Sequence, residues 1–133
     1  MKKGGIINAQ LAGLIAGLGH TDLFMIVDGG MPIPGGVEIV DLALCGGVPL
    51  FRQVMDAVLE ETVVEYYYLA EEIKEKNVPL HGYILEKLAG VKGEYIPHVE
   101  LKGRSGKVKF AIRTGEFTPY PNVILQAGVS FAV

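Results

Sequence analysis

One segment concentrates most of the side chains that could do chemistry in this chain. Residues 113–122 read RTGEFTPYPN and combine a carboxylate, a phenol, an amide and two prolines. Proline fixes φ and removes a hydrogen-bond donor, so Pro119 and Pro121 stiffen the loop and hold Tyr120 and Asn122 in set directions. A rigid polar loop at the mouth of a buried strand suits a small polar ligand, although a plain turn with a tyrosine lid fits the same residues.

A second group of candidate residues lies in the N-terminal third, where GHTD at 19–22 precedes LFMIVDGGMPIP at 23–34. A histidine ordinarily titrates near neutral pH and can exchange protons, so His20 is a candidate acid or base, although its position at an element junction also suits a structural role. Asp28 could accept hydrogen bonds from two hydroxyl groups of a ligand, or merely cap the amides of Gly29 and Gly30.

These polar residues lie at the ends of alternating apolar elements. Asn8 suits the N-cap of a first helix that Gly19 can end, and the apolar run 23–27 suits a strand buried on both faces. Further strands are expected at 37–42, 62–69, 94–96, 108–113 and 123–131. Helices are expected from Pro49, at 79–88 and at 97–102. The pattern of residues 70–76 is ambiguous. This alternation predicts an α/β fold, a single-domain layered sandwich with a mainly parallel sheet flanked by helices. Asp28 would then lie at the carboxyl end of a strand, where open α/β sheets bind ligands.

The bulk composition narrows the class of protein. With 133 residues, 50% of them hydrophobic and 20% charged, the chain is expected to form one domain, 1–133, with a real core. The net charge of −3 argues against nucleic acid as a partner. A small group of basic residues is interpreted as a solvated loop, with an anion-tolerant rim as the alternative; it comprises Lys102, Arg104, Lys107 and Lys109.

The single cysteine, Cys45, excludes an internal disulfide and fits a reducing compartment. Its neighbours Leu44 and Gly46 suggest a small buried hydrophobe. No ligand pattern indicates a metal, and no segment is long and apolar enough to span a bilayer. Because Asn8 and Gln10 interrupt the first apolar stretch, we do not interpret it as a secretory signal and expect a cytoplasmic protein without membrane contact.

Together, the motif at 19–34 and the loop at 113–122 resemble the D-ribose pyranase family, the sugar mutarotases of ribose utilisation. The resemblance runs from Met1 to Val133 and keeps order and spacing. Two departures stand out: GGMP at 29–32 replaces Ala-Gly-Leu-Pro, and Pro121 replaces an alanine. Neither departure removes a polar group.

The resemblance implies an isomerase that interconverts the β-pyranose and β-furanose forms of D-ribose and feeds a ribokinase. Ring opening requires proton transfer at the ring oxygen and at the anomeric hydroxyl, and no metal or other cofactor. The matching histidine of the family is the proton donor, so the resemblance assigns that role to His20. It also implies substrate contacts from Asp28, His98, Tyr120 and Asn122.

Other polar residues receive subsidiary interpretations. Asp22 is close enough in sequence to orient the imidazole of His20. Glu116 is expected to pair with Arg113 or to brace the loop. His81 carries no motif and is interpreted as structural, and Lys102 is expected at the rim of the binding pocket.

The tyrosine run at 66–68 alternates faces on its expected strand, so at least one ring should point away from the core of its own subunit. This favours a homo-oligomer, and the resemblance implies a decamer of stacked rings with the site near a subunit boundary. Two alternatives stay open: a fucose-type mutarotase, and a non-catalytic cytosolic sugar-binding accessory of ribose uptake.

Overall fold

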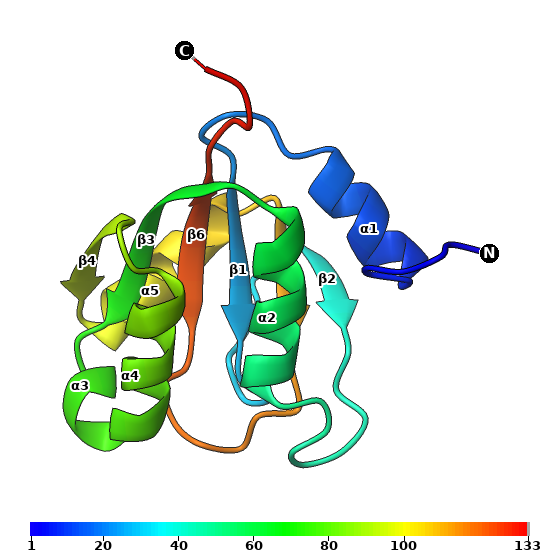
Figure 1. Ribbon diagram of the computed structural model, residues 1–133. Coiled ribbons are helices and arrows are strands. Elements are labelled where there is room, and N and C mark those ends of the chain that lie inside the picture. Colours follow the sequence, from blue (N-terminus) through cyan, green and yellow to red (C-terminus); the bar gives the residue numbers. More distant parts are fainter. Residues whose placement is uncertain (133) are drawn as a thin grey trace.

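A single mixed sheet organises the computed structural model, which describes residues 1–132. Its strands are β1 (Leu23–Val27), β2 (Glu38–Asp41), β3 (Val64–Ala70), β4 (Lys92–Ile96), β5 (Phe110–Arg113) and β6 (Val123–Ala127), in the order β2-β5-β1-β6-β3-β4. The pairs β1–β5, β2–β5 and β3–β4 are parallel, and β6 runs antiparallel between β1 and β3. The predicted α/β fold with a mainly parallel sheet is confirmed, and β6 is the strand of opposite direction (Figure 1).

Helices cover both faces of this sheet. They are α1 (Ala9–Ala16), α2 (Phe51–Glu61), α3 (Ile73–Lys76), α4 (Val78–Lys87) and α5 (His98–Arg104). In Figure 1, α2 and α4 lie in front of the sheet and α5 lies behind it. Alternate residues of β1 enter different cores, because Phe24 packs with α2 and α4 residues whereas Met25 packs with Leu101 of α5. This explains why β1 reads as a continuous apolar run.

Two predicted elements end earlier than their sequences suggested. The first helix begins as expected, with the Asn8 Oδ1 accepting from the Leu11 N–H at 2.9 Å, but it ends at Gly17 and not at Gly19. The last strand leaves the sheet after Ala127 because its neighbour β1 begins at Leu23, opposite Gln126. The ambiguous residues 70–76 contain the short helix α3.

The prediction that Cys45 is a buried hydrophobe was wrong, because the structure exposes its side chain. Cys45 lies in a turn where it forms an isolated bridge with Val48. The apolar neighbour that suggested burial, Leu44, is itself 81% exposed. None of the helices in residues 1–132 has the length and hydrophobicity needed to cross a bilayer.

Candidate functional site

Four of the predicted site residues meet at one end of the sheet. Asp28 follows β1, His98 begins α5 just after β4, and Tyr120 and Asn122 immediately precede β6. Because β6 runs against its neighbours, its start lies at the same edge as the carboxyl ends of β1 and β4. These side chains line a cavity of ≈ 230 Å³, and Lys102 lines it as expected.

A hydrogen-bonded pair fixes the carboxylate in this cavity. The Asn122 Oδ1 accepts from the Asp28 N–H at 2.9 Å, and the Asn122 Nδ2 donates to the Asp28 Oδ2 at 3.1 Å. The other carboxylate oxygen accepts from the Gly30 N–H at 2.8 Å. Asn122 is only 1% exposed, so Asp28 is held in one orientation while each of its oxygens keeps a lone pair for a further donor.

His98 and Tyr120 line the same cavity and contact each other. Their rings meet edge to face with centroids 5.0 Å apart, and the backbone N–H of His98 donates to both Glu72 carboxylate oxygens at 3.0 and 3.1 Å. The Nδ1 of His98 is the buried side-chain atom without a hydrogen-bond partner in the described part of the chain. Burial, and then the nearby charge of Lys102, lower the pKa of His98, so a neutral imidazole faces the cavity at neutral pH.

This electrostatic arrangement predicts a stability that falls in mild acid. Burial also lowers the pKa of His81. Each of these two histidines therefore has a lower pKa in the folded chain than in the unfolded chain, where it is about 6.5, and below that pH the unfolded chain binds more protons. The free energy of unfolding must therefore decrease as the pH falls below that value. We expect a lower thermal midpoint at about pH 5.5 than at pH 7.5, and a smaller difference in His98→Gln. Equal midpoints at the two pH values in the wild type would contradict these histidine environments.

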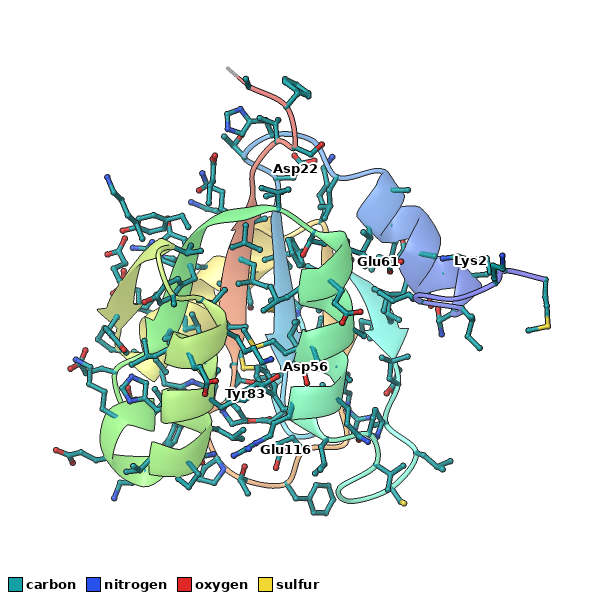
Figure 2. All side chains as sticks on the ribbon, viewed as in Figure 1. Lys2, Asp22, Asp56, Glu61, Tyr83 and Glu116 are labelled. Atoms are coloured by element: carbon teal, nitrogen blue, oxygen red, sulfur yellow. The ribbon has the colours of Figure 1, made fainter. Side chains whose placement is uncertain are left out.

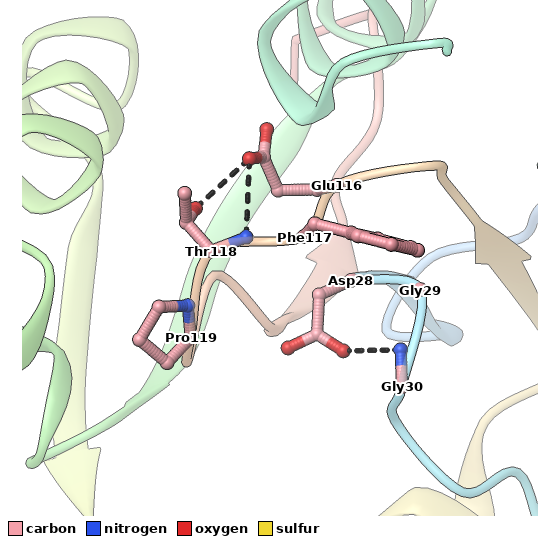
Figure 3. A pocket seen from close by; sticks show the side chains of 7 residues that line it. All are labelled: Asp28, Gly29, Gly30, Glu116, Phe117, Thr118 and Pro119. Atoms are coloured by element: carbon pink, nitrogen blue, oxygen red, sulfur yellow. Dashed lines mark hydrogen bonds between the residues drawn. The ribbon is translucent and has the colours of Figure 1, made fainter. Parts of the chain in front are cut away.

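The loop that carries Tyr120 is braced by a buried carboxylate. Glu116 is 6% exposed; its Oε1 accepts from the Phe51 N–H at 3.1 Å and its Oε2 accepts from the Thr118 hydroxyl at 2.9 Å. Of the two roles expected for Glu116, bracing is the correct one, because Arg113 instead pairs with Asp41 at 3.0 Å. Figure 3 shows Glu116 turned away from Asp28, toward Thr118.

A larger hollow of ≈ 450 Å³ adjoins the cavity and shares Asp28, Gly30 and Pro119 with it. Its remaining lining comprises Gly29, the exposed Phe117, and Glu116 and Thr118, which are hydrogen-bonded to each other (Figure 3). The smaller cavity is therefore the better site for a polyhydroxyl ligand, because donors and acceptors converge there.

His20 lies at the other end of the sheet. It belongs to the loop that leads into β1, whereas Asp28 follows β1, so the length of β1, roughly 16 Å at about 3.3 Å per residue, separates them. Figure 2 shows Asp22, two residues after His20, at the top of the molecule and Glu116 at the bottom. A single subunit thus assembles the predicted binding residues but does not bring His20 to them.

The partner of the His20 imidazole is Glu65, not Asp22. The His20 Nε2 lies 2.9 Å from the Glu65 Oε2, while Asp22 pairs with Lys109 at 2.7 Å and accepts from the Gly19 N–H. The expectation that Asp22 orients the imidazole was therefore wrong. Sequence reasoning missed Glu65 because the contact joins the chain before β1 to β3, and only the order β1-β6-β3 brings them together.

Asn77 is a second residue that sequence reasoning missed, although an asparagine shortly before Pro79 is typical of a helix N-cap. Its Oδ1 caps α4 by accepting from the Leu80 N–H, and its Nδ2 donates to the Thr118 hydroxyl and to the Pro119 carbonyl oxygen at 2.9 and 2.8 Å. The polar loop is therefore tied to α4 as well as to α2. Within residues 1–132 there is no group of three or more His, Cys, Asp or Glu side chains that could hold a metal ion.

Comparisons with known proteins give a consistent picture. The family model described as the RbsD / FucU transport protein family matches residues 1–130. D-ribose pyranase 1 of Rubrobacter xylanophilus is 49% identical over 131 residues, which cover 98% of this chain and 100% of that protein. The structure of Bacillus subtilis RbsD complexed with D-ribose matches with a TM-score of 0.95 and 45% identity over 98% of this chain and 100% of that chain. The fucose mutarotase of Streptococcus pneumoniae in complex with L-fucose, at 20% identity and a TM-score of 0.79 over 94% of this chain and 95% of that chain, shares the fold.

Proposed function

Because this chain belongs to the RbsD / FucU transport protein family, we propose that it is a D-ribose pyranase, an isomerase that interconverts the pyranose and furanose forms of D-ribose. The observation that carries this proposal is the convergence of Asp28, His98, Tyr120 and Asn122 on one small cavity. We infer that residues 1–133 act as one domain and that the protein works in the cytoplasm, where it would supply ribose to a ribokinase.

In this proposal the cavity binds the sugar through its hydroxyl groups. Asp28 accepts hydrogen bonds from hydroxyl groups, and the neutral His98 offers an acceptor and a donor nitrogen. Asn122 keeps Asp28 in place and contacts the sugar beside it, while Tyr120 offers an aromatic face and a hydroxyl. Pro119 and Pro121 on either side limit the movement of the tyrosine.

His20 would carry the proton transfer. A neutral imidazole nitrogen takes the proton of the anomeric hydroxyl and returns it to the ring oxygen as the bond between C1 and the ring oxygen breaks and the C1=O bond forms. A different hydroxyl then attacks the aldehyde, and the same transfers run in reverse. No proton is gained or lost overall, so no cofactor is required.

Since His20 cannot reach the cavity of its own subunit, we infer that a neighbouring subunit supplies it. Apolar side chains are exposed at both ends of the sheet. Leu44 (81%) and Phe117 (79%) line a hollow together with Gly29, just after β1. Phe131 (70%) lies in the segment after β6, which ends where Ala127 is hydrogen-bonded to Thr21, the neighbour of His20. A contact between opposite ends is heterologous, and such contacts close into rings when the rotation allows. This favours the ring-shaped homo-oligomer, and we propose a decamer of stacked rings.

Mixing two inactive variants tests this arrangement. With D-ribose well below saturation, His20→Ala and Asp28→Asn subunits are each expected to show little exchange activity. An oligomer reassembled from equal amounts should regain about one quarter of the wild-type activity per subunit, because one site in four combines an intact cavity with an intact neighbouring histidine. Exchange of D-ribose is measured on the mixture and on each variant treated alike. If the mixture stays as inactive as its parts, His20 does not act across a subunit boundary.

A sugar panel tests the function itself. We expect the wild-type protein to accelerate pyranose–furanose exchange of D-ribose more than anomer exchange of L-fucose, since the relative with 49% identity is a D-ribose pyranase. Faster exchange with L-fucose would favour the fucose-type mutarotase. Binding of D-ribose without any acceleration would favour a non-catalytic sugar-binding accessory.

A further inference from the structure

His20, a carboxylate and an amide form a chain of hydrogen-bonded side chains. The His20 Nε2 lies 2.9 Å from the Glu65 Oε2, and the Gln126 Nε2 donates to the Glu65 Oε1 at 2.8 Å. Glu65 belongs to β3, at the point where its pairing with β6 shifts register between Val64 and Tyr66, and Gln126 belongs to β6, so both partners stand on strands and not on a loop. One carboxylate oxygen is thus held by Gln126, while the other contacts the imidazole of His20.

The loop of His20 is held independently of this contact. The Thr21 N–H donates to the Ala127 carbonyl oxygen at 2.9 Å, and the Ala127 N–H donates to the Asp22 carbonyl oxygen at 2.8 Å. Thr21 has φ of 71°, a left-handed conformation that a β-branched residue rarely adopts. Such strained positions persist where the surroundings over-determine them and cluster at functional sites. These backbone constraints therefore hold His20 in a position where its side chain meets Glu65.

We propose that Glu65 is a positioning residue for His20, which holds the imidazole with its hydrogen on Nε2 and leaves Nδ1 as the nitrogen that exchanges a proton with the sugar. This inference rests on the proposed function. An ionised carboxylate only accepts hydrogen bonds, so the nitrogen that faces it must carry a hydrogen, and the lone pair of the neutral ring lies on the other nitrogen. Hydrogen bonds from Gln126 and from His20 lower the pKa of Glu65, which keeps it ionised at neutral pH.

The variant Glu65→Gln separates positioning from mere packing. If Gln126 keeps its hydrogen bond, the new side chain turns its carbonyl oxygen to Gln126 and presents its NH₂ group to the His20 Nε2. Because the NH₂ group donates a hydrogen bond, the Nε2 must accept it, and the hydrogen of the neutral imidazole moves to Nδ1. Nδ1 is the nitrogen that the proposal requires to be unprotonated. The exchange rate at saturating D-ribose should fall roughly tenfold to a hundredfold, as when partners that fix a histidine are removed from metal sites. The KM should stay the same because the side chain of Glu65 contacts His20 and Gln126, and neither of these is assigned a role in binding the sugar.

Two readouts and a matched control complete the experiment. Nitrogen-15 NMR of selectively labelled histidine reports the tautomer of His20 without substrate, and saturation transfer on D-ribose reports the rate. Glu60→Gln changes an exposed carboxylate of α2 and should leave both readouts unchanged. Glu65→Ala, which leaves the Nε2 without its acceptor, should populate both tautomers and also lose rate, provided that the thermal midpoint shows an intact fold.

The outcomes are distinct. A changed tautomer with a lower rate and an unchanged KM supports the role of Glu65. An unchanged tautomer, or a full rate in Glu65→Gln beside an active wild type, would overturn it and leave the proposed function standing. A wild-type protein that accelerates no exchange would remove the proposed function, and with it the catalytic role of Glu65, while the tautomer measurement would still decide whether the pair exists.

Discussion

Replacing His20 by alanine is expected to reduce ring interconversion of D-ribose by roughly 10²- to 10⁴-fold, the usual contribution of a positioned acid or base. Binding of D-ribose should change little, because the side chains that line the cavity belong to other segments. The fold should also persist, since the His20 side chain is 49% exposed. Exchange kinetics and titration calorimetry on the same preparation measure the two effects.

The matched control for this variant is His81→Ala. His81 is half-buried against Tyr95, whose hydroxyl it contacts, and it takes no part in the cavity. Its replacement should cost some stability but no exchange activity. Equal losses of activity in the two variants would show that the effect of His20 is structural and not chemical.

Replacing Asp28 by asparagine is expected to weaken D-ribose binding roughly tenfold to a hundredfold, since a hydrogen bond to a charged group is worth about 1.5–3 kcal/mol and about 1.4 kcal/mol corresponds to a factor of ten. The new amide still accepts from the Gly30 N–H but offers one acceptor fewer to the sugar. Titration calorimetry with D-ribose measures the loss, with Asp56→Asn on α2 as a control outside the cavity.

A reciprocal exchange distinguishes sugar binding from loop capping. In the double variant Asp28→Asn with Asn122→Asp, the amide at 28 can donate to the carboxylate at 122, and that carboxylate can accept from the N–H of residue 28. The internal hydrogen bonds of the pair are thereby restored. Binding should remain weak if the carboxylate must stand at position 28. Full recovery in the double variant would show that Asp28 only caps its own loop.

The sequence allowed prediction of the parts of this molecule that depend on local pattern. The apolar run of β1 required a strand buried on both faces, and Asp28 at its end had to lie at the carboxyl edge of the sheet. The N-cap at Asn8 follows from side-chain chemistry alone, and its hydrogen bond to the Leu11 N–H is present. These features need no knowledge of which strand lies beside which.

The relations that were missed depend on strand order and on distant loops. Glu65 reaches His20 only because β6 stands between β1 and β3. Asp22 was the natural candidate for the partner of His20 because the two are close in sequence. Lys109, which directly precedes β5, instead lies 2.7 Å from Asp22. Likewise Leu44 suggested burial around Cys45, although nothing in a local pattern tells a core segment from an exposed apolar turn.

The most direct test of the central claim is NMR saturation transfer on D-ribose with the purified wild-type protein. Irradiation of the β-pyranose anomeric proton should transfer saturation to the furanose signals faster than in the same solution without protein, and His20→Ala should abolish the difference. Transfer at the uncatalysed rate, in a sample shown to bind D-ribose, would contradict the claim that this protein opens and recloses the sugar ring.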